Sequence, residues 1–176
     1  VEKEFIELIH NLLESGGIDA MILQDYDKGV LSPKLIAALI DAAERMKVPV
    51  LVDPKFRSFE LYKNVRLFKP NFKELSKGLK LEVQKHEVEA IAAKVMEFQK
   101  NQEIGTMLLT LSEQGVLTTT GESYAHIPAI VRDIADVSGA GDTVISVAAL
   151  CLIAGLADGE IAAISNLAGG QVCEKS

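Results

Sequence analysis

Short apolar runs alternate along this chain with longer segments in which apolar residues recur every three or four positions. Such runs predict buried strands, and such segments predict amphipathic helices. The expected strands cover residues 20–23, 48–52, 65–68 and 104–111. The expected helices cover residues 4–14, 33–47, 84–101, 143–156 and 159–172. Because strands joined by helices of this length form right-handed crossovers, the pattern predicts an α/β fold with a mainly parallel sheet and helices on both faces. Residues 116–119 and 123–127, which flank a Gly-containing turn, predict an antiparallel hairpin.

Composition and charge limit the class of protein. The chain has 176 residues, of which 48% are hydrophobic, so residues 1–176 can form a single domain. A net charge of −7 disfavours binding to nucleic acid or to an anionic membrane surface. No apolar run reaches about 18 residues and no basic leader is present, so we expect a cytoplasmic protein without a membrane span. Cys151 and Cys173 lie in apolar helical stretches without metal-ligand spacing, which predicts buried thiols in a reducing compartment.

A glycine-rich turn precedes the most apolar of the expected helices. Gly139 and Gly141 allow a tight turn that exposes successive backbone N–H groups, and the helix that follows adds the positive end of its dipole. The turn is therefore suited to hold an anion such as a phosphate. Asp142 would repel that anion unless it has a task, such as taking a proton from the group that attacks the phosphate. This combination predicts phosphoryl transfer.

Polar residues also follow the expected strands, at the point where each strand ends. They are Asp25 with Lys28, Asp53 with Lys55, Asn71 with Glu74, and Thr110 with Ser112. In open α/β sheets, ligands bind in the crevice outside the carboxyl ends of the strands. We therefore expect these separated segments to converge on one crevice.

Each of these residues also has a purely structural interpretation. Asp142 can serve as a favourable charge in the first turn of its helix. Asn71 and Glu74 have the spacing of a helix N-cap and its N3 partner, which needs no ligand. Strand-end hydroxyls, an ion pair at Asp53-Pro54-Lys55 and a solvated loop around Lys28 are equally ordinary features. The sequence leaves these alternatives open.

Five segments carry a resemblance to a known family. Residues 136–142, D-V-S-G-A-G-D, are similar to the D-T-x-G-A-G-D signature of the ribokinase-like (PfkB) carbohydrate kinases, with Val in place of the usual Thr. Residues 70–74 resemble the N-x-x-E marker of the family, and residues 110–115 resemble its T-x-G-x-x-G strand end, with Ser replacing the first Gly. Residues 25–29 and 52–55 most resemble the kinase domains that phosphorylate heptose 7-phosphate on the way to ADP-heptose.

The resemblance implies a ribokinase-like three-layer fold and assigns roles to individual residues. Asp142 would be the catalytic base, and the N–H groups of Gly139, Ala140 and Gly141 would form the anion hole for the transferring γ-phosphoryl group. Asn71 and Glu74 would organise Mg²⁺, through water, and the phosphates of ATP. The remaining residues implied to bind the nucleotide are Thr110, Ser112, Gly115 and Asn166. Asp136 and Ser138 match positions that bind a monovalent cation, K⁺, in some members, and the residues expected on the substrate side are Asp25, Lys28, Asp53 and Lys55.

Members of this family carry an N-terminal segment with further strands, a Gly-Gly sugar motif and a β-sheet lid that often mediates a homodimer. None of these precedes Val1, so we expect the chain to be the C-terminal, nucleotide-binding part of a kinase, inactive by itself. In many heptose enzymes a nucleotidyltransferase domain is fused beyond the kinase. The expected partners are ATP and a sugar phosphate. Two alternatives stay open: a kinase for another sugar, nucleoside or fructose phosphate, and a catalytically silent nucleotide-binding module.

Overall fold

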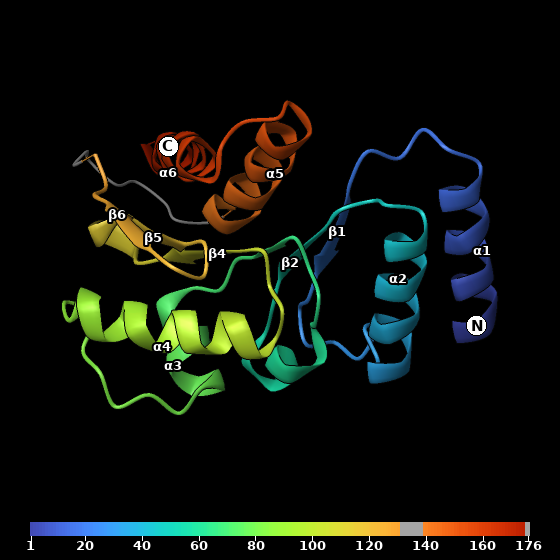
Figure 1. Cartoon of the computed structure of the whole chain (residues 1–176), viewed down its shortest axis with the longest axis horizontal. Helices are drawn as coiled ribbons and strands as arrows, with labels where there is room; N and C mark the ends of the chain where they lie inside the picture. The colour runs from blue at the N-terminus through green and yellow to red at the C-terminus, as the bar shows by residue number, and fades with distance from the viewer. Residues whose placement is uncertain (131–138, 175–176) are drawn as a thin grey trace.

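The computed structural model describes residues 1–130 and 139–174, which form one sheet with helices on both of its faces (Figure 1). The strands are β1 (Met21–Gln24), β2 (Val50–Asp53), β3 (Leu67–Phe68), β4 (Thr106–Thr110), β5 (Val116–Thr119) and β6 (Tyr124–Ile127). The α-helices are α1 (Glu2–Glu14), α2 (Pro33–Arg45), α3 (Phe72–Gly78), α4 (Val88–Asn101), α5 (Ala140–Ile153) and α6 (Asp158–Glu174). Two short 3₁₀ helices are η1 (Phe56–Leu61) and η2 (Ser112–Gln114). The predicted α/β class with a mainly parallel sheet is confirmed.

The described strands lie in the sheet in the same order as in the chain, from β1 to β6. Strands β1 to β4 run parallel, while β4, β5 and β6 pair antiparallel, which confirms the predicted hairpin. The register places Gln24 opposite Asp53, and a further bridge joins Asn71 to Thr110. The segments that end the parallel strands therefore meet at one edge of the sheet.

The period of two along the buried strands divides the core between the two faces of the sheet. Val52 and Phe68 belong to the core cluster that α2, η1 and α4 cover. Their neighbours Leu51 and Leu67 belong to the cluster that α5 and α6 cover. Successive parallel strands are added in one direction, so right-handed crossovers place their connecting segments on the same face. The opposite face is left for α5 and α6, which lie together above the sheet in Figure 1.

Helix α1 packs against α2, at the end of the molecule next to β1 (Figure 1). Ser32 links the two helices, because its hydroxyl donates to Glu2 at 2.6 Å and accepts from the N–H of Leu35 as the N-cap of α2. Leu13 of α1 is buried, whereas Phe5 and Leu8 on the same helix are exposed. The predicted helix is confirmed, but part of its apolar side is not covered by the described residues.

Several element boundaries differ from the prediction, among them the following three. Helix α4 begins at Val88 and not at residue 84, because the carboxylate of Glu87 accepts the N–H of Gln84 and closes a turn before the helix. Strand β3 is confined to two residues, although the N–H groups of Arg66 and Lys69 extend its pairing to Val50 and Val52. Helix α5 starts three residues earlier than predicted, within the glycine turn itself.

Within the described residues, no helix combines the length and the apolar character that crossing a membrane requires.

Candidate functional site

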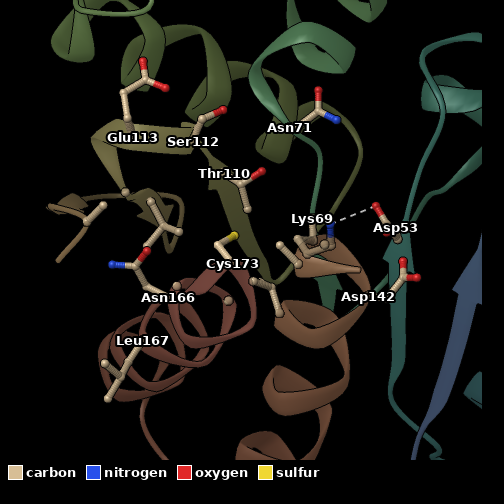
Figure 2. Close-up of a pocket in the computed structure, with 18 of the residues that line it drawn as sticks. Asp53, Lys69, Asn71, Thr110, Ser112, Glu113, Asp142, Asn166, Leu167 and Cys173 are labelled. Carbon is tan, nitrogen blue, oxygen red and sulfur yellow. Dashed lines mark ion pairs between the residues drawn. The ribbon is translucent and has the colours of Figure 1, made fainter. Parts of the chain in front are cut away.

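A pocket of about 510 Å³ lies at the carboxyl edge of the sheet, between the strand ends and the helices α5 and α6 (Figure 2). It brings together most of the residues that the sequence predicted for the site. Those that line it are Asp53, Lys55, Asn71, Glu74, Thr110, Ser112, Gly115, Ala140, Gly141, Asp142 and Asn166. The expected convergence on one crevice is confirmed as geometry for the segments at 53–55, 71–74 and 110–112, and the roles of the individual residues stay predictions.

The glycine turn forms the start of α5 at this pocket. Gly139 is the N-cap residue with φ of 77°, in the left-handed region that favours glycine. A Cβ atom at Gly141 would lie 3.5 Å from the ammonium nitrogen of Lys69, so this lysine sits directly beside the turn. The positive end of the α5 dipole and the ammonium group therefore face the same part of the pocket. Together they make it attractive to an anion.

Asp142 stands in the first turn of α5 and is exposed. One carboxylate oxygen accepts a hydrogen bond from Gln24 at 2.5 Å, and the other accepts one from the Tyr26 hydroxyl at 3.3 Å. Its carboxylate raises the pKa of Tyr26, because the tyrosinate form would place two negative charges side by side. The end of β1 thus contacts the predicted catalytic base.

Lys69 and Asp53 form an ion pair that is buried at the floor of the pocket. The Lys69 ammonium lies 3.0 Å from Asp53 Oδ1, and the lysine side chain is only 3% exposed (Figure 2). Burial raises the pKa of Asp53, and the neighbouring Lys69 only partly offsets this. Sequence reasoning missed Lys69. The available signal was its position, since it follows a buried strand directly and precedes Pro70 and Asn71.

Asn71, Glu74 and Lys55 form a second polar group in the pocket. Asn71 caps α3 by accepting the Glu74 N–H at 2.9 Å, and its own N–H donates to Glu74 Oε2 at 2.9 Å. The other oxygen, Oε1, accepts from the Lys55 ammonium at 2.5 Å. Partial burial lowers the pKa of Lys55, but the hydrogen bond to Glu74 and the negative charges of Glu74, Asp53 and Asp25 together outweigh it and leave the pKa raised. The structural interpretation of Asn71 and Glu74 as a capping box is therefore correct, and it does not exclude a ligand in the same pocket.

Ser112 and Gly115 shape the turn that leads from β4 into β5. Ser112 has φ of 54°, in the region that glycine adopts without strain, which explains why the related motif carries Gly at this position. Gly115 has φ of 88°, and a Cβ atom there would lie 2.1 Å from the carbonyl oxygen of Ile127. Both positions are thus constrained by the backbone, and the turn they make lines the pocket next to Thr110.

Helix α6 closes the pocket on the side away from Asp142 (Figure 2). The amide nitrogen of Asn166 donates to the carbonyl oxygen of Pro128 at 3.1 Å, which ties α6 to the segment after β6. Cys151 is buried as expected, but Cys173 is half-buried and lines the pocket. The prediction of two buried thiols is therefore wrong for Cys173, because the face of α6 that carries it looks onto the pocket.

Three of the predicted site residues that the structure describes, Asp25, Lys28 and Gly139, do not line the pocket. Asp25 is buried, and its carboxylate accepts the N–H of Asp27 at 2.8 Å and the hydroxyl of Tyr62 at 3.0 Å. Lys28 is exposed on the loop that follows. Asp25 thus organises the end of β1, and a contact of Asp25 or Lys28 with a substrate stays a prediction.

The predicted monovalent cation ligands, Asp136 and Ser138, lie outside the described residues. In the part of the chain that the structure describes, no group of three or more His, Cys, Asp or Glu side chains could hold a metal ion. A divalent cation at this pocket would therefore depend on a few protein groups, water and a bound phosphate, as is usual for Mg²⁺.

Comparison with known proteins agrees with this geometry. Residues 10–176 match the model of the pfkB family carbohydrate kinases. The bifunctional protein HldE of Geotalea uraniireducens is 34% identical over 173 residues, which cover 97% of this chain and 35% of that protein. The bifunctional protein HldE of Aeromonas hydrophila is 40% identical over 159 residues, which cover 89% and 32%. The chain therefore spans about a third of the length of the curated relatives that it matches.

Solved structures show the same fold. A mutant of phosphofructokinase-2 from Escherichia coli superposes with a TM-score of 0.84 at 22% identity, over 98% of this chain and 57% of that chain. Phosphofructokinase-2 from Escherichia coli in complex with potassium has a TM-score of 0.82 at 19% identity, over 97% and 56%. At these identities the likeness concerns the fold, and the family model and the curated relatives identify the family. The chain belongs to the pfkB family of carbohydrate kinases.

Proposed function

We propose that this chain forms the nucleotide-binding and catalytic part of an ATP-dependent kinase that phosphorylates a hydroxyl of a sugar phosphate. One observation carries the proposal: Ala140 and Gly141 of the glycine turn, the Asp142 carboxylate and the buried Lys69 ammonium all line a single pocket. An anion cradle with a carboxylate beside it is what transfer of a phosphoryl group to a hydroxyl requires.

In this proposal the backbone N–H groups of Gly139, Ala140 and Gly141 receive the γ-phosphoryl oxygens of ATP. The helix dipole and the Lys69 ammonium add positive charge at that point, where the transition state spreads negative charge over the equatorial oxygens. Asp142 takes the proton of the acceptor hydroxyl. Phosphoryl transfer depends mainly on positioning and charge neutralisation, so this small set of groups is sufficient.

The residues present fit Mg²⁺ that would be held through water. Both oxygens of Glu74 already accept hydrogen bonds, from Lys55 and from the Asn71 N–H, yet the carboxylate and the Asn71 side chain still line the pocket. Asn71 and Glu74 would hold water molecules of a hydrated ion, which would neutralise charge on the phosphates of ATP when bound. The family resemblance proposes K⁺ at Asp136 and Ser138.

Heptose 7-phosphate is the acceptor that we propose, with its anomeric hydroxyl as the attacking group. The segments at 25–29 and 52–55 support this choice through their resemblance to heptose 7-phosphate kinases, and so do the relatives at 34–40% identity. For the complete protein, a homodimer, a fused nucleotidyltransferase domain and a role in making the ADP-heptose of lipopolysaccharide are further parts of the proposal.

The Asp142→Asn variant tests the catalytic role. We expect it to lose at least about 99% of the turnover of the complete protein, because general base catalysis contributes roughly 10²-fold or more. Binding of Mg·ATP, measured by calorimetry, should persist, since the anion cradle is made of backbone groups. Asp41→Asn changes an exposed carboxylate on α2 in the same way and serves as the matched control. Retention of more than about a tenth of the rate by Asp142→Asn would remove Asp142 from this role.

The acceptor is tested separately, with Mg·ATP and either heptose 7-phosphate or fructose 6-phosphate. A kcat/KM for heptose 7-phosphate at least about tenfold higher than that for fructose 6-phosphate supports the proposal, since this ratio corresponds to about 1.4 kcal/mol of transition-state discrimination. A preference for fructose 6-phosphate would replace the acceptor and keep the reaction class. Binding of Mg·ATP without transfer to either sugar would instead support a catalytically silent nucleotide-binding module.

A further inference from the structure

The two carboxylate oxygens of Asp142 have different partners, and this difference has a consequence for catalysis. Oδ1 accepts a bond of 2.5 Å from the side-chain amide of Gln24. Oδ2 accepts a bond of 3.3 Å from the hydroxyl of Tyr26, a residue that is 58% exposed. One oxygen is therefore held closely by a residue at the end of β1, and the other has a long contact with a side chain that solvent reaches.

Gln24 is itself anchored. An amide group carries two N–H donors, and the second contact of Gln24 Nε2 reaches Oδ2 of Asp53 at 3.2 Å. Asp53 is buried, and its other oxygen, Oδ1, pairs with the buried Lys69 ammonium. A continuous set of polar contacts thus runs from Lys69 through Asp53 and Gln24 to Asp142. The amide lies between two carboxylates and separates two negative charges that would otherwise repel each other.

We propose that Gln24 is a positioning residue that fixes Oδ1 of Asp142, and that Oδ2 is the oxygen that takes the proton from the acceptor hydroxyl. This inference rests on the proposed role of Asp142 as the base. In the step, the O–H bond of the acceptor breaks and its proton passes to Oδ2. The acceptor oxygen forms its bond to the γ-phosphorus while the bond from that phosphorus to the bridging oxygen breaks, and ADP leaves with the electron pair. The acceptor hydroxyl replaces the Tyr26 hydroxyl at Oδ2.

A merely structural role of Gln24 predicts something different. If Gln24 only connected β1 to α5, its loss would lower the stability of the protein, and any fall in kcat would reflect only the smaller folded fraction. A positioning role predicts a selective loss of kcat, because a misplaced base slows proton transfer although the ATP site is intact. The comparison of kcat with the KM for Mg·ATP and with Tm separates the two.

Two variants that conserve the shape of Gln24 provide the test in the complete protein. Gln24→Met removes the donor, and we expect kcat for heptose 7-phosphate to fall by about tenfold or more, with the KM for Mg·ATP changed by less than about twofold. Gln24→Glu should lower kcat further, because it adds a carboxylate between Asp53 and Asp142. Gln84→Met, at an exposed glutamine before α4, is the matched control and should keep the wild-type kcat.

Tyr26→Phe identifies the oxygen that accepts the proton. We expect its loss of kcat to be smaller than that of Gln24→Met, since the acceptor hydroxyl takes the place of the phenol. A larger loss in Tyr26→Phe than in Gln24→Met would assign proton transfer to Oδ1 and overturn this part of the proposal.

The outcomes separate this inference from the function on which it rests. If Asp142→Asn is inactive and Gln24→Met keeps kcat within about twofold, the positioning role of Gln24 is wrong and the kinase proposal stands. Should Asp142→Asn stay active, the base itself is misassigned. In the Asp142→Asn background, Gln24→Met should cause no further loss of the residual rate, because the carboxylate that it positions is gone.

Discussion

At the scale of single residues, the pocket depends on one buried cation. Lys69 is almost fully enclosed, and a lysine is rarely buried unless it is paired. Its partner Asp53 has a raised pKa, because burial outweighs the neighbouring ammonium. Burial is therefore not fully offset at Asp53, and a charged pair with such a perturbed member in a pocket is a candidate for binding a ligand. The position of Lys69 beside Gly141 is consistent with that use.

Lys69→Met should destabilise the protein strongly. Removing one member of a buried ion pair leaves the other charge without compensation, which costs about 3–5 kcal/mol. The double variant Lys69→Met/Asp53→Leu removes both charges and should be more stable than the single variant. Urea unfolding at neutral pH measures both effects. Lys94→Met, in the exposed pair with Glu97, is the control and should cost no more than about 0.5 kcal/mol. If Lys69→Met also cost no more than about 0.5 kcal/mol, this result would contradict a buried ion pair between Lys69 and Asp53.

At the scale of elements, the turn between β4 and β5 depends on backbone conformations that only certain residues tolerate. Gly115→Ala should destabilise the protein by about 3 kcal/mol or more, because the positive φ is strained for alanine and the new Cβ would overlap the Ile127 carbonyl oxygen. Ser112→Gly is the matched control, since it places glycine at a positive φ and should be neutral or stabilising by up to about 1 kcal/mol. Equal stability of Gly115→Ala and the wild type in urea unfolding would show that the hairpin lies elsewhere.

The strands, the start of α4 and the pocket show which features the sequence could predict and which it could not. The hydrophobic pattern predicted the strands as short apolar runs, because the side chains of β2 and β4 are apolar toward both cores, and it predicted the hairpin from two such runs around a glycine turn. It placed the start of α4 too early, since the bond between Gln84 and Glu87 leaves no trace in a hydrophobic pattern. Polar residues at strand ends predicted the pocket. Lys69 was missed because its partner Asp53 lies on another strand, and their proximity follows from a register that the sequence does not state.

At the scale of the whole molecule, the sheet separates two hydrophobic cores, one on each of its faces. The core under α2 and α4 contains the aromatic side chains Phe59, Phe68 and Phe98, which pack against one another with ring centroids 5.1–5.8 Å apart. Tyr62 is buried beside this group, and its hydroxyl donates to Asp25 at the end of β1. The Tyr62 hydroxyl, a titratable group in this core, is therefore linked through Asp25 to β1, the strand that carries Gln24. The ionisation of this group couples pH to the stability of the fold.

Stability should fall steeply with pH above about 10, the usual pKa of tyrosine in an unfolded chain. Burial raises the pKa of Tyr62 in the folded state, and the Asp25 carboxylate adds to the shift. Below about pH 10 the contribution of Tyr62 to stability is fully present. Above it, the unfolded chain loses a proton that the folded protein keeps, so the free energy of unfolding falls by about 1.4 kcal/mol per pH unit from this residue.

Tyr62→Phe removes that proton, and the variant should be less stable at neutral pH by about 1.5–3 kcal/mol, because the bond to the Asp25 carboxylate is lost. Between about pH 10 and 11.5, however, its free energy of unfolding should decline less steeply than that of the wild type. Urea unfolding at pH values across this range measures both slopes. Tyr124→Phe, on the exposed strand β6, should keep the wild-type slope. If Tyr62→Phe and the wild type lose stability in parallel, the hydroxyl is not held protonated in the core, and the alkaline response belongs to other groups.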